Sequence, residues 1–125
     1  MLRALRKHHI SFKNAFAGLL WAVRTQPNFR VHLACSALAI SLGLYLRILP
    51  IEMTIIIFTI LLGLTVEMLN TAVEAMTDLI THEWRQEAKI AKDVAAGSML
   101  LVATGAVAVA CFIFIPYLHQ RLGIF

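Results

Sequence analysis

Residues 53–80 read MTIIIFTILLGLTVEMLNTAVEAMTDLI, an apolar stretch whose second half is interrupted by Glu67, Asn70, Glu74 and Asp78. A helix that spans a membrane needs about 20 mostly apolar residues, and this stretch exceeds that length. Pro50 is favourable in a first helical turn, and Glu52 complements the positive end of the helix dipole. The stretch therefore predicts a spanning helix over about residues 51–80.

Two more stretches have the same character. Residues 31–46 and 94–118 contain no Asp, Glu, Lys or Arg, and we expect the helices around them to extend over about 28–49 and 84–118. Hydrophobic residues make up 60% of the 125 residues and charged residues 14%, against about 45–50% and 25% in an average soluble domain. We therefore expect a single all-α membrane domain, residues 1–125, with three transmembrane helices.

The N-terminal segment has a different pattern. Apolar residues recur at helical spacing over about 5–25, and basic residues fall between them. This pattern predicts an amphipathic helix that lies in the membrane surface and ends at Pro27. Basic residues interrupt the apolar ones, so we expect no cleavable signal. The apolar positions are Leu5, Phe12, Phe16, Leu19 and Val23.

Basic residues predict the orientation of the spans. Nine lie before the first span or between the second and third: Arg3, Arg6, Lys7, Lys13, Arg24, Arg30, Arg85, Lys89 and Lys92. The opposite side holds only Arg47 and Arg121. The N-terminus and the 81–93 loop are therefore expected in the cytoplasm. Basic residues beside apolar segments favour anionic membrane lipids as partners and argue against nucleic acid.

Four polar residues of the second span lie on one helical face. Glu67, Asn70, Glu74 and Asp78 fall within an arc of about 80°, at about 100° per residue. Asp78 is near enough to the cytoplasmic end to be solvated, whereas Glu67 lies about three turns deeper. Such groups could simply join helices by hydrogen bonds, but Ser, Thr and Asn usually fill that role. Deep carboxylates favour a functional site.

The third span begins with charged residues that could face this site. Lys89, Lys92 and Asp93 have helical spacing and precede the small residues 95–98, which would let another helix approach closely. Acids and bases together at the interface suit a phosphate–metal substrate. The glycines match neither GxxxxGK[ST] nor GxGxxG. We interpret Cys35 and Cys111 as buried packing residues rather than metal ligands.

Three motifs carry a resemblance to a known family. EMLNTAVEAMTD at 67–78, AKIAKDVAAG at 88–97 and NFRVHL at 28–33 closely resemble the small prokaryotic diacylglycerol kinase and undecaprenol kinase family. The resemblance implies a homotrimer of three-span subunits in the cytoplasmic membrane. It also implies composite active sites at the cytoplasmic interface, which phosphorylate a lipid alcohol with MgATP.

The resemblance also implies roles for residues of this chain. Glu67 would be the general base with Asn70 as an orienting group, and Glu74 would be a Mg²⁺ ligand. Lys92 and Asp93 would contact the nucleotide, and we place Asp78 and Lys89 with them. Many family members carry Glu where this chain has Gln26. That Glu helps to bind the metal, whereas Gln26 is a neutral ligand and should bind Mg²⁺ less tightly.

We therefore expect an ATP-dependent lipid kinase. The motifs at 88–97 and 70–74 look more like the undecaprenol branch than the diacylglycerol branch. Two alternatives remain: a small ion- or proton-coupled transporter that uses Glu67 as a relay, and a non-catalytic membrane scaffold. The transporter is disfavoured because nothing polar continues outward from Glu67 along that helix. The scaffold leaves the carboxylates and Lys92 unexplained.

Overall fold

The computed structural model describes the backbone of residues 2–122 and the side chains of residues 11–121. It contains four helices in the described part of the chain: α1 (Leu2–Thr25), α2 (Pro27–Leu46), α3 (Pro50–Ile80) and α4 (Gln86–Leu122). Three of them, α2, α3 and α4, are long and apolar enough to cross a membrane. The all-α fold with three spans is therefore confirmed, and the chain is a multi-pass membrane protein.

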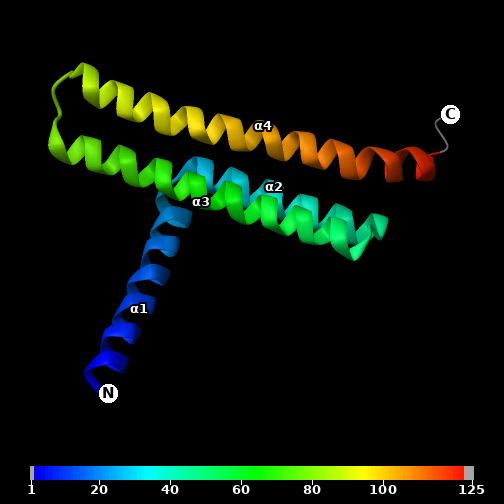
Figure 1. Cartoon of the computed structure of the whole chain (residues 1–125), viewed down its shortest axis with the longest axis horizontal. Coiled ribbons are helices and arrows are strands. Elements are labelled where there is room, and N and C mark those ends of the chain that lie inside the picture. Colours follow the sequence, from blue (N-terminus) through cyan, green and yellow to red (C-terminus); the bar gives the residue numbers. More distant parts are fainter. Residues whose placement is uncertain (1, 123–125) are drawn as a thin grey trace.

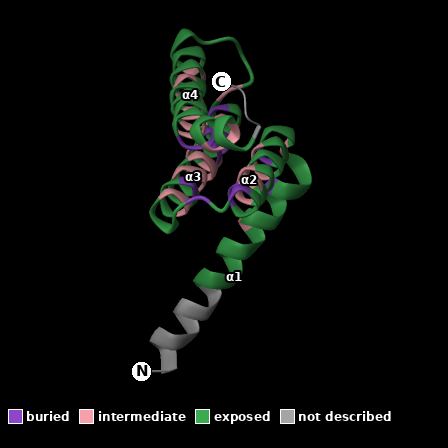
Figure 2. Cartoon of the chain, turned by 90° about the vertical axis from the view of Figure 1, so that its right-hand side faces the viewer, coloured by how far each residue is buried: buried purple, intermediate pink, exposed green. Residues whose placement is uncertain are grey.

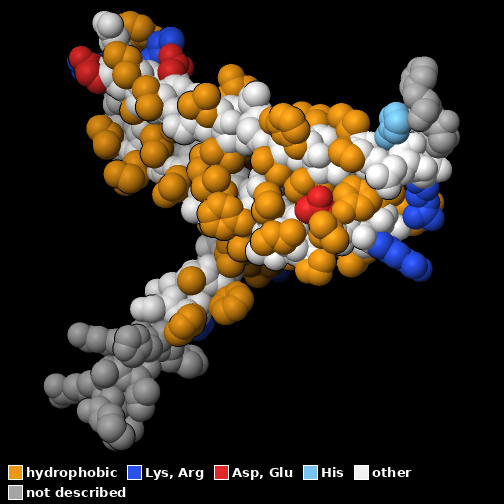
Figure 3. Space-filling view, turned by 45° about the vertical axis from the view of Figure 1, so that its right-hand side comes forward, with side chains coloured by type: hydrophobic (Ala, Val, Ile, Leu, Met, Phe, Trp, Pro, Cys, Tyr) orange, Lys and Arg blue, Asp and Glu red, His pale blue; other side chains and the backbone are white. Residues whose placement is uncertain are grey.

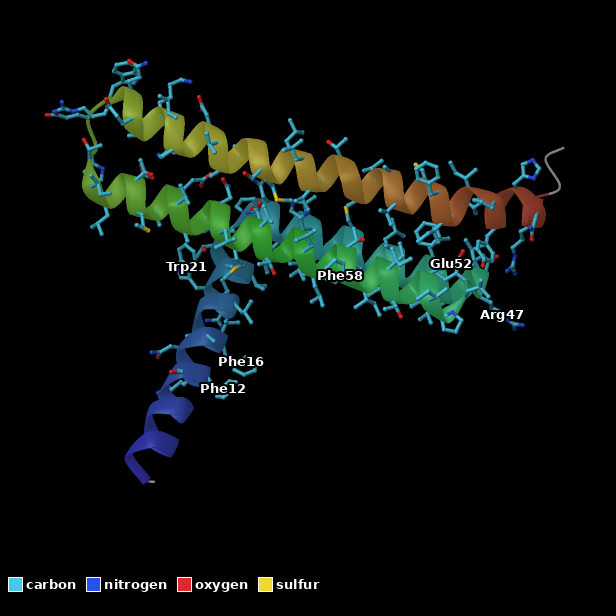
Figure 4. All side chains as sticks on the ribbon, in the orientation of Figure 1. Phe12, Phe16, Trp21, Arg47, Glu52 and Phe58 are labelled. Atoms are coloured by element: carbon cyan, nitrogen blue, oxygen red, sulfur yellow. The ribbon has the colours of Figure 1, made fainter. Side chains whose placement is uncertain are left out.

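Helix α1 projects sideways from the bundle that α2, α3 and α4 form (Figure 1). Of its described apolar residues, Ala22 is buried, whereas Phe12 and Phe16 are 66% and 70% exposed and project from the same side (Figure 4). This arrangement fits a helix that lies in the membrane surface while the bundle crosses the bilayer. The side chains of Arg3, Leu5, Arg6 and Lys7 lie outside the described residues.

Helix α2 ends three residues earlier than expected. Arg47 adopts a left-handed conformation with φ of 55°, and its N–H donates to the carbonyls of Gly43 and Leu44. That geometry closes the helix at Leu46. Helix α4 begins at Gln86 rather than at residue 84. It continues through Pro116 to Leu122, beyond the expected end at residue 118. Proline is tolerated within spanning helices because neighbouring groups satisfy the freed backbone.

Helices α3 and α4 form a long hairpin against which α2 packs (Figure 1). At 1.5 Å per residue α3 is about 46 Å long and α2 about 30 Å, close to the thickness of the hydrocarbon core. The hairpin therefore extends beyond the start of α2, so its α3–α4 end reaches past the level of α1. On the face shown in Figure 3, hydrophobic side chains cover the middle of the bundle and most charges gather at its ends.

The apolar core lies at the end of the bundle where α2 turns into α3. Its buried members are Leu46, Ile48, Ile56, Ile113 and Phe114. Figure 2 shows buried and half-buried residues on the sides of the spans that face one another, with exposed residues outside. Most large hydrophobic residues remain exposed on the single chain, as expected for a surface that contacts lipid or other subunits.

Polar contacts join the same end of the bundle. Glu52 accepts a hydrogen bond from the N–H of Leu49 at 2.8 Å, which caps α3, and another from the hydroxyl of Tyr117 at 2.6 Å. Arg121 donates to the carbonyl of Tyr45 at 3.1 Å and stacks over its ring at 4.3 Å. These contacts fix the C-terminal part of α4 against the α2–α3 turn.

Candidate active site

Helix α3 buries polar side chains on the face that packs inside the bundle. Glu67 is 2% exposed and Asn70 is 7% exposed, while Glu74 is half-buried. These residues are three and four positions apart in the sequence, a spacing that keeps side chains on one face of a helix. The expected polar face of α3 therefore exists and is turned into the protein.

Glu67 lies where a carboxylate is costly. Among the described residues, its side chain forms neither a hydrogen bond nor an ion pair. Removing an ionised carboxylate from water without a partner costs several kcal/mol or more. Ionisable side chains within membrane spans are rare and usually mark functional sites.

Asn70 and Glu74 form a pair one turn nearer the hairpin end. The Asn70 amide donates from Nδ2 to Glu74 Oε1 at 2.9 Å. The other end of the same amide, Oδ1, is buried without a partner among the described residues. A buried carbonyl oxygen with no donor needs a ligand, a water or a cation. The Glu74 carboxylate lies beside the same Asn70 side chain. The groups that could bind a cation here are therefore oxygen atoms.

At the hairpin end, α3 and α4 are joined by an ion pair. Lys92 Nζ lies 2.5 Å from Asp78 Oδ1, and Lys89 forms a second pair with Asp93 within α4. Asp78 is about 16 Å beyond Glu67 along the helix and its side chain is 58% exposed, as expected for a solvated residue. The position that continues the buried face is Thr77, at 8% exposed.

Gln26 lies between α1 and α2 in the extended conformation expected of a residue before proline, with φ of −99° and ψ of 107°. Its side-chain amide donates to Thr25 Oγ1 at 3.4 Å. Within residues 11–121, no group of three His, Cys, Asp or Glu could hold a metal ion. A divalent metal would therefore need further oxygen ligands, and Mg²⁺ commonly takes these from substrate phosphates and water.

Comparisons with known proteins now identify the chain. The family profile described as prokaryotic diacylglycerol kinase matches residues 13–114. This match covers α2 and α3 entirely and most of α4, so it includes every site residue described above. The chain belongs to the prokaryotic diacylglycerol kinase family.

Relatives in this family have two different names. The chain is 38% identical over 108 residues to a diacylglycerol kinase of Synechocystis, over 86% of this chain and 62% of that protein. It is 35% identical over 114 residues to the undecaprenol kinase of Bacillus subtilis, over 91% of this chain and 93% of that protein. A diacylglycerol kinase of Pseudomonas aeruginosa is 31% identical over 90 residues, covering 72% and 73%.

One interpretation of the sequence needs correction. Cys35 and Cys111 are exposed on the chain rather than buried, because other parts of the single chain cover little of the surface of its spans. Among the small residues at 95–98, Gly97 leaves room on the single chain for another helix to approach. A Cβ atom added to Gly97 would meet nothing within 4 Å.

Two buried residues beside the polar face, Thr71 and Thr77, were not predicted from the sequence. Thr77 donates its hydroxyl to the carbonyl of Val73 at 2.7 Å, and such internal bonding makes threonine inconspicuous in a span. The groove near His32 was missed as well, although the small residues that line it were a visible signal.

Proposed function

We propose that the chain is an integral-membrane lipid kinase that transfers the γ-phosphate of ATP to a lipid alcohol. The observation that carries the proposal is the carboxylate of Glu67, which is buried and has no partner among the described residues. It lies on the same face of α3 as the Asn70–Glu74 pair, which continues toward the Lys92–Asp78 bridge. One helix face thus joins a base at membrane depth to charged groups at the interface.

The proposed reaction begins at Glu67. Its carboxylate removes the proton from the lipid hydroxyl, whose oxygen forms a bond to the γ-phosphorus. The bond between that phosphorus and the β–γ bridging oxygen breaks, and ADP leaves with the electron pair. Phosphoryl transfer of this kind needs positioning and charge neutralisation more than covalent participation by the protein.

The metal-binding residues would be Glu74 and Gln26. The oxygen-only donor set fits Mg²⁺, and the partnerless Oδ1 of Asn70 provides a further oxygen at the same place. Bound Mg²⁺ supplies neutralisation of the charge on the phosphates. Asn70 holds the Glu74 carboxylate in one orientation through its Nδ2 hydrogen bond.

The nucleotide would lie at the hairpin end of the site. Lys92 presents an ammonium group 2.5 Å from Asp78 and would move to, or share its charge with, the phosphates. Asp93 and Lys89, which pair with each other on α4, would complete the nucleotide side. Lysine is well suited to phosphate as a point charge.

We place the hairpin end and the N-terminus in the cytoplasm on the basis of the positive charges counted above. We also propose a homotrimer in the cytoplasmic membrane. The exposed hydrophobic residues of all three spans leave ample surface for other subunits. Gly97 is open in the single chain, so a neighbouring subunit could approach α4 there.

The preferred substrate is undecaprenol, with diacylglycerol next. The test is purified protein in mixed micelles with MgATP, offered each alcohol separately, with the phosphorylated lipid measured directly. We expect undecaprenol to have the higher kcat/KM. A clear reversal would move the protein to the other branch, and no transfer to either alcohol would refute the kinase proposal.

The ion-transport alternative gains no support from α3. Outward from Glu67, the same face continues with Gly63, Ile60 and Ile56, which offer no ligand to an ion. This apolar face lines a groove between the spans.

A further inference from the structure

An open groove lies between the three spans on the outer side of Glu67. It has a volume of about 190 Å³ and receives residues from α2, α3 and α4. The lining is mostly aliphatic and includes several alanines and Gly63, while His32, Cys35 and Ser36 contribute polar atoms on α2 and Thr59 contributes a hydroxyl on α3. The mechanism proposed above makes no use of this groove.

On α3 the groove and the active site share one helical face. The groove residues Ile56, Ile60 and Gly63 continue the spacing of four and three that leads to Glu67. Gly63 lies one turn from Glu67, and Ile56 lies about 16 Å from it along the helix. The groove therefore runs outward from the carboxylate over about half the thickness of the hydrocarbon core.

On α4 the same relation holds. Met99 and Ala106 line the groove and lie seven and fourteen residues after Lys92. A spacing of seven residues returns to nearly the same face, with a drift of only about 20° per heptad. The groove is therefore the membrane-side continuation of the face that carries Lys92.

On α2 the groove begins with His32 and continues through Ser36 and Ala39. His32 lies less than two turns from Gln26, at the same end of the bundle as the proposed site. All three helices thus lead from polar groups at one end of the groove to aliphatic side chains at the other. That polarity matches a molecule with a hydroxyl head and a hydrocarbon tail.

We propose that this groove holds the hydrocarbon chain of the lipid alcohol while its hydroxyl lies at Glu67. The inference rests on the proposed kinase function and deepens it. It specifies which part of the lipid the protein recognises, namely one hydrocarbon chain next to the hydroxyl. A polyprenol and a diacylglycerol both supply such a chain. The second chain of a diacylglycerol would remain outside, in the bilayer.

Small residues keep the groove open. A Cβ atom at Gly63 would lie 3.9 Å from Val102 Cγ1, so alanine would fit there and a larger side chain would enter the groove. Ala103 lines the groove from α4, whereas Ala108 is exposed and does not line it. These two alanines make a matched pair for a filling experiment.

The first test uses the wild-type protein in detergent micelles and needs no turnover. Cys35 lines the groove and Cys111 does not, and both are exposed on the chain. At about ten times its dissociation constant, a bound alcohol should slow alkylation of Cys35 by N-ethylmaleimide about ten-fold and leave Cys111 unchanged. Undecaprenol, dioleoylglycerol and squalene, a hydrocarbon without a hydroxyl, are added separately.

Protection of Cys35 by either alcohol but not by squalene supports the proposal and identifies the chain that binds. Equal protection by squalene would overturn it, since the groove would then be an unselective lipid crevice. Lack of reaction at Cys35 without any lipid would also overturn it, because another subunit would then cover the groove. Failure of the kinase proposal would appear separately, as protection without phosphoryl transfer.

The second test fills the groove. Ala103→Phe should raise KM for the lipid alcohol about ten-fold or more, with KM for ATP unchanged. Ala108→Phe should leave both values within about two-fold of wild type. If both variants raise KM for the alcohol equally, the groove does not hold its chain.

Discussion

Tyr117 and Glu52, 65 residues apart in the sequence, are joined by a 2.6 Å hydrogen bond in which the tyrosine hydroxyl donates to Glu52 Oε2. The same carboxylate oxygen accepts the N–H of Leu49 at 2.8 Å. One side chain thus caps α3 and ties α4 to the start of α3. The register of α4 against α3, on which the position of Lys92 depends, is set in part at the opposite end of the bundle.

Tyr117→Phe should therefore lower the melting temperature by a few degrees in a fixed detergent, because Glu52 loses a charge-assisted partner. The matched control is Tyr45→Phe, since the Tyr45 hydroxyl makes no hydrogen bond among the described residues. The measurement is a thermal unfolding curve for each variant. Equal melting temperatures for the two variants would show that the Tyr117 hydrogen bond adds no stability.

Glu67→Gln should remove about 99% or more of the turnover, the scale at which general bases usually contribute. The substitution is nearly isosteric, and a neutral amide is less costly to bury than a carboxylate, so the solubilised oligomer should persist. Turnover is measured in mixed micelles and oligomer size by light scattering. Glu87→Gln, at an exposed position of α4, is the control; activity of Glu67→Gln within a few-fold of this control would make Glu67 structural.

Lys92→Met should raise KM for ATP strongly, whereas Asp78→Asn should change stability by less than about 1 kcal/mol. The reason for the second expectation is that the Lys92–Asp78 pair is 40% and 58% exposed, and exposed ion pairs are screened by solvent. Initial rates at varied ATP and thermal melts separate the two effects. A large loss of stability in both variants, with KM for ATP unchanged, would assign the pair a purely structural role.

Gln26→Glu should lower the Mg²⁺ concentration required for half-maximal activity, because it adds a negative oxygen ligand. Glu74→Gln should raise that concentration or abolish activity. The control is Gln120→Glu, which adds the same charge at the far end of α4. If Gln26→Glu requires the same Mg²⁺ concentration as this control, Gln26 does not contact the metal. Asp78 then becomes the next residue to test as the partner of Glu74.

Single cysteines should reveal the orientation of the spans. In a background without Cys35 and Cys111, Arg47→Cys should react with an impermeant maleimide on intact cells, and Arg85→Cys should react only after permeabilisation. Arg47 and Arg85 lie at opposite ends of α3, and the charge bias predicts that the second is cytoplasmic. Labelling of both residues from outside would contradict the three-span topology.

The spans and the polar face of α3 could be predicted from the sequence because both depend on local periodicity. Hydropathy alone located α2, α3 and α4 to within a few residues, and the helical angle placed Glu67, Asn70 and Glu74 together. Arg47 could not be predicted to end α2, since arginine has no intrinsic preference for a left-handed conformation.

Features that depend on how helices pack were out of reach. The sequence predicts that Lys92 and Asp78 belong to one site, but their direct contact depends on the register of the α3–α4 hairpin. The burial of Thr77 beside an exposed Asp78 depends on the same register. The groove at His32 requires three helices at once, and no single helical pattern specifies it.

One end of α4 is fixed against the α2–α3 turn by the buried cluster of Leu46, Ile48, Ile56, Ile113 and Phe114. From Phe114 to Lys92, α4 is about 33 Å long. At its far end the 81–85 connection joins it to α3, together with one solvated ion pair among the described side chains. A tilt of about 3° at the cluster would displace Lys92 by about 2 Å, enough to break and remake that contact. A tilt of this kind would open the nucleotide end of the proposed site with every helix intact and the packed end at rest.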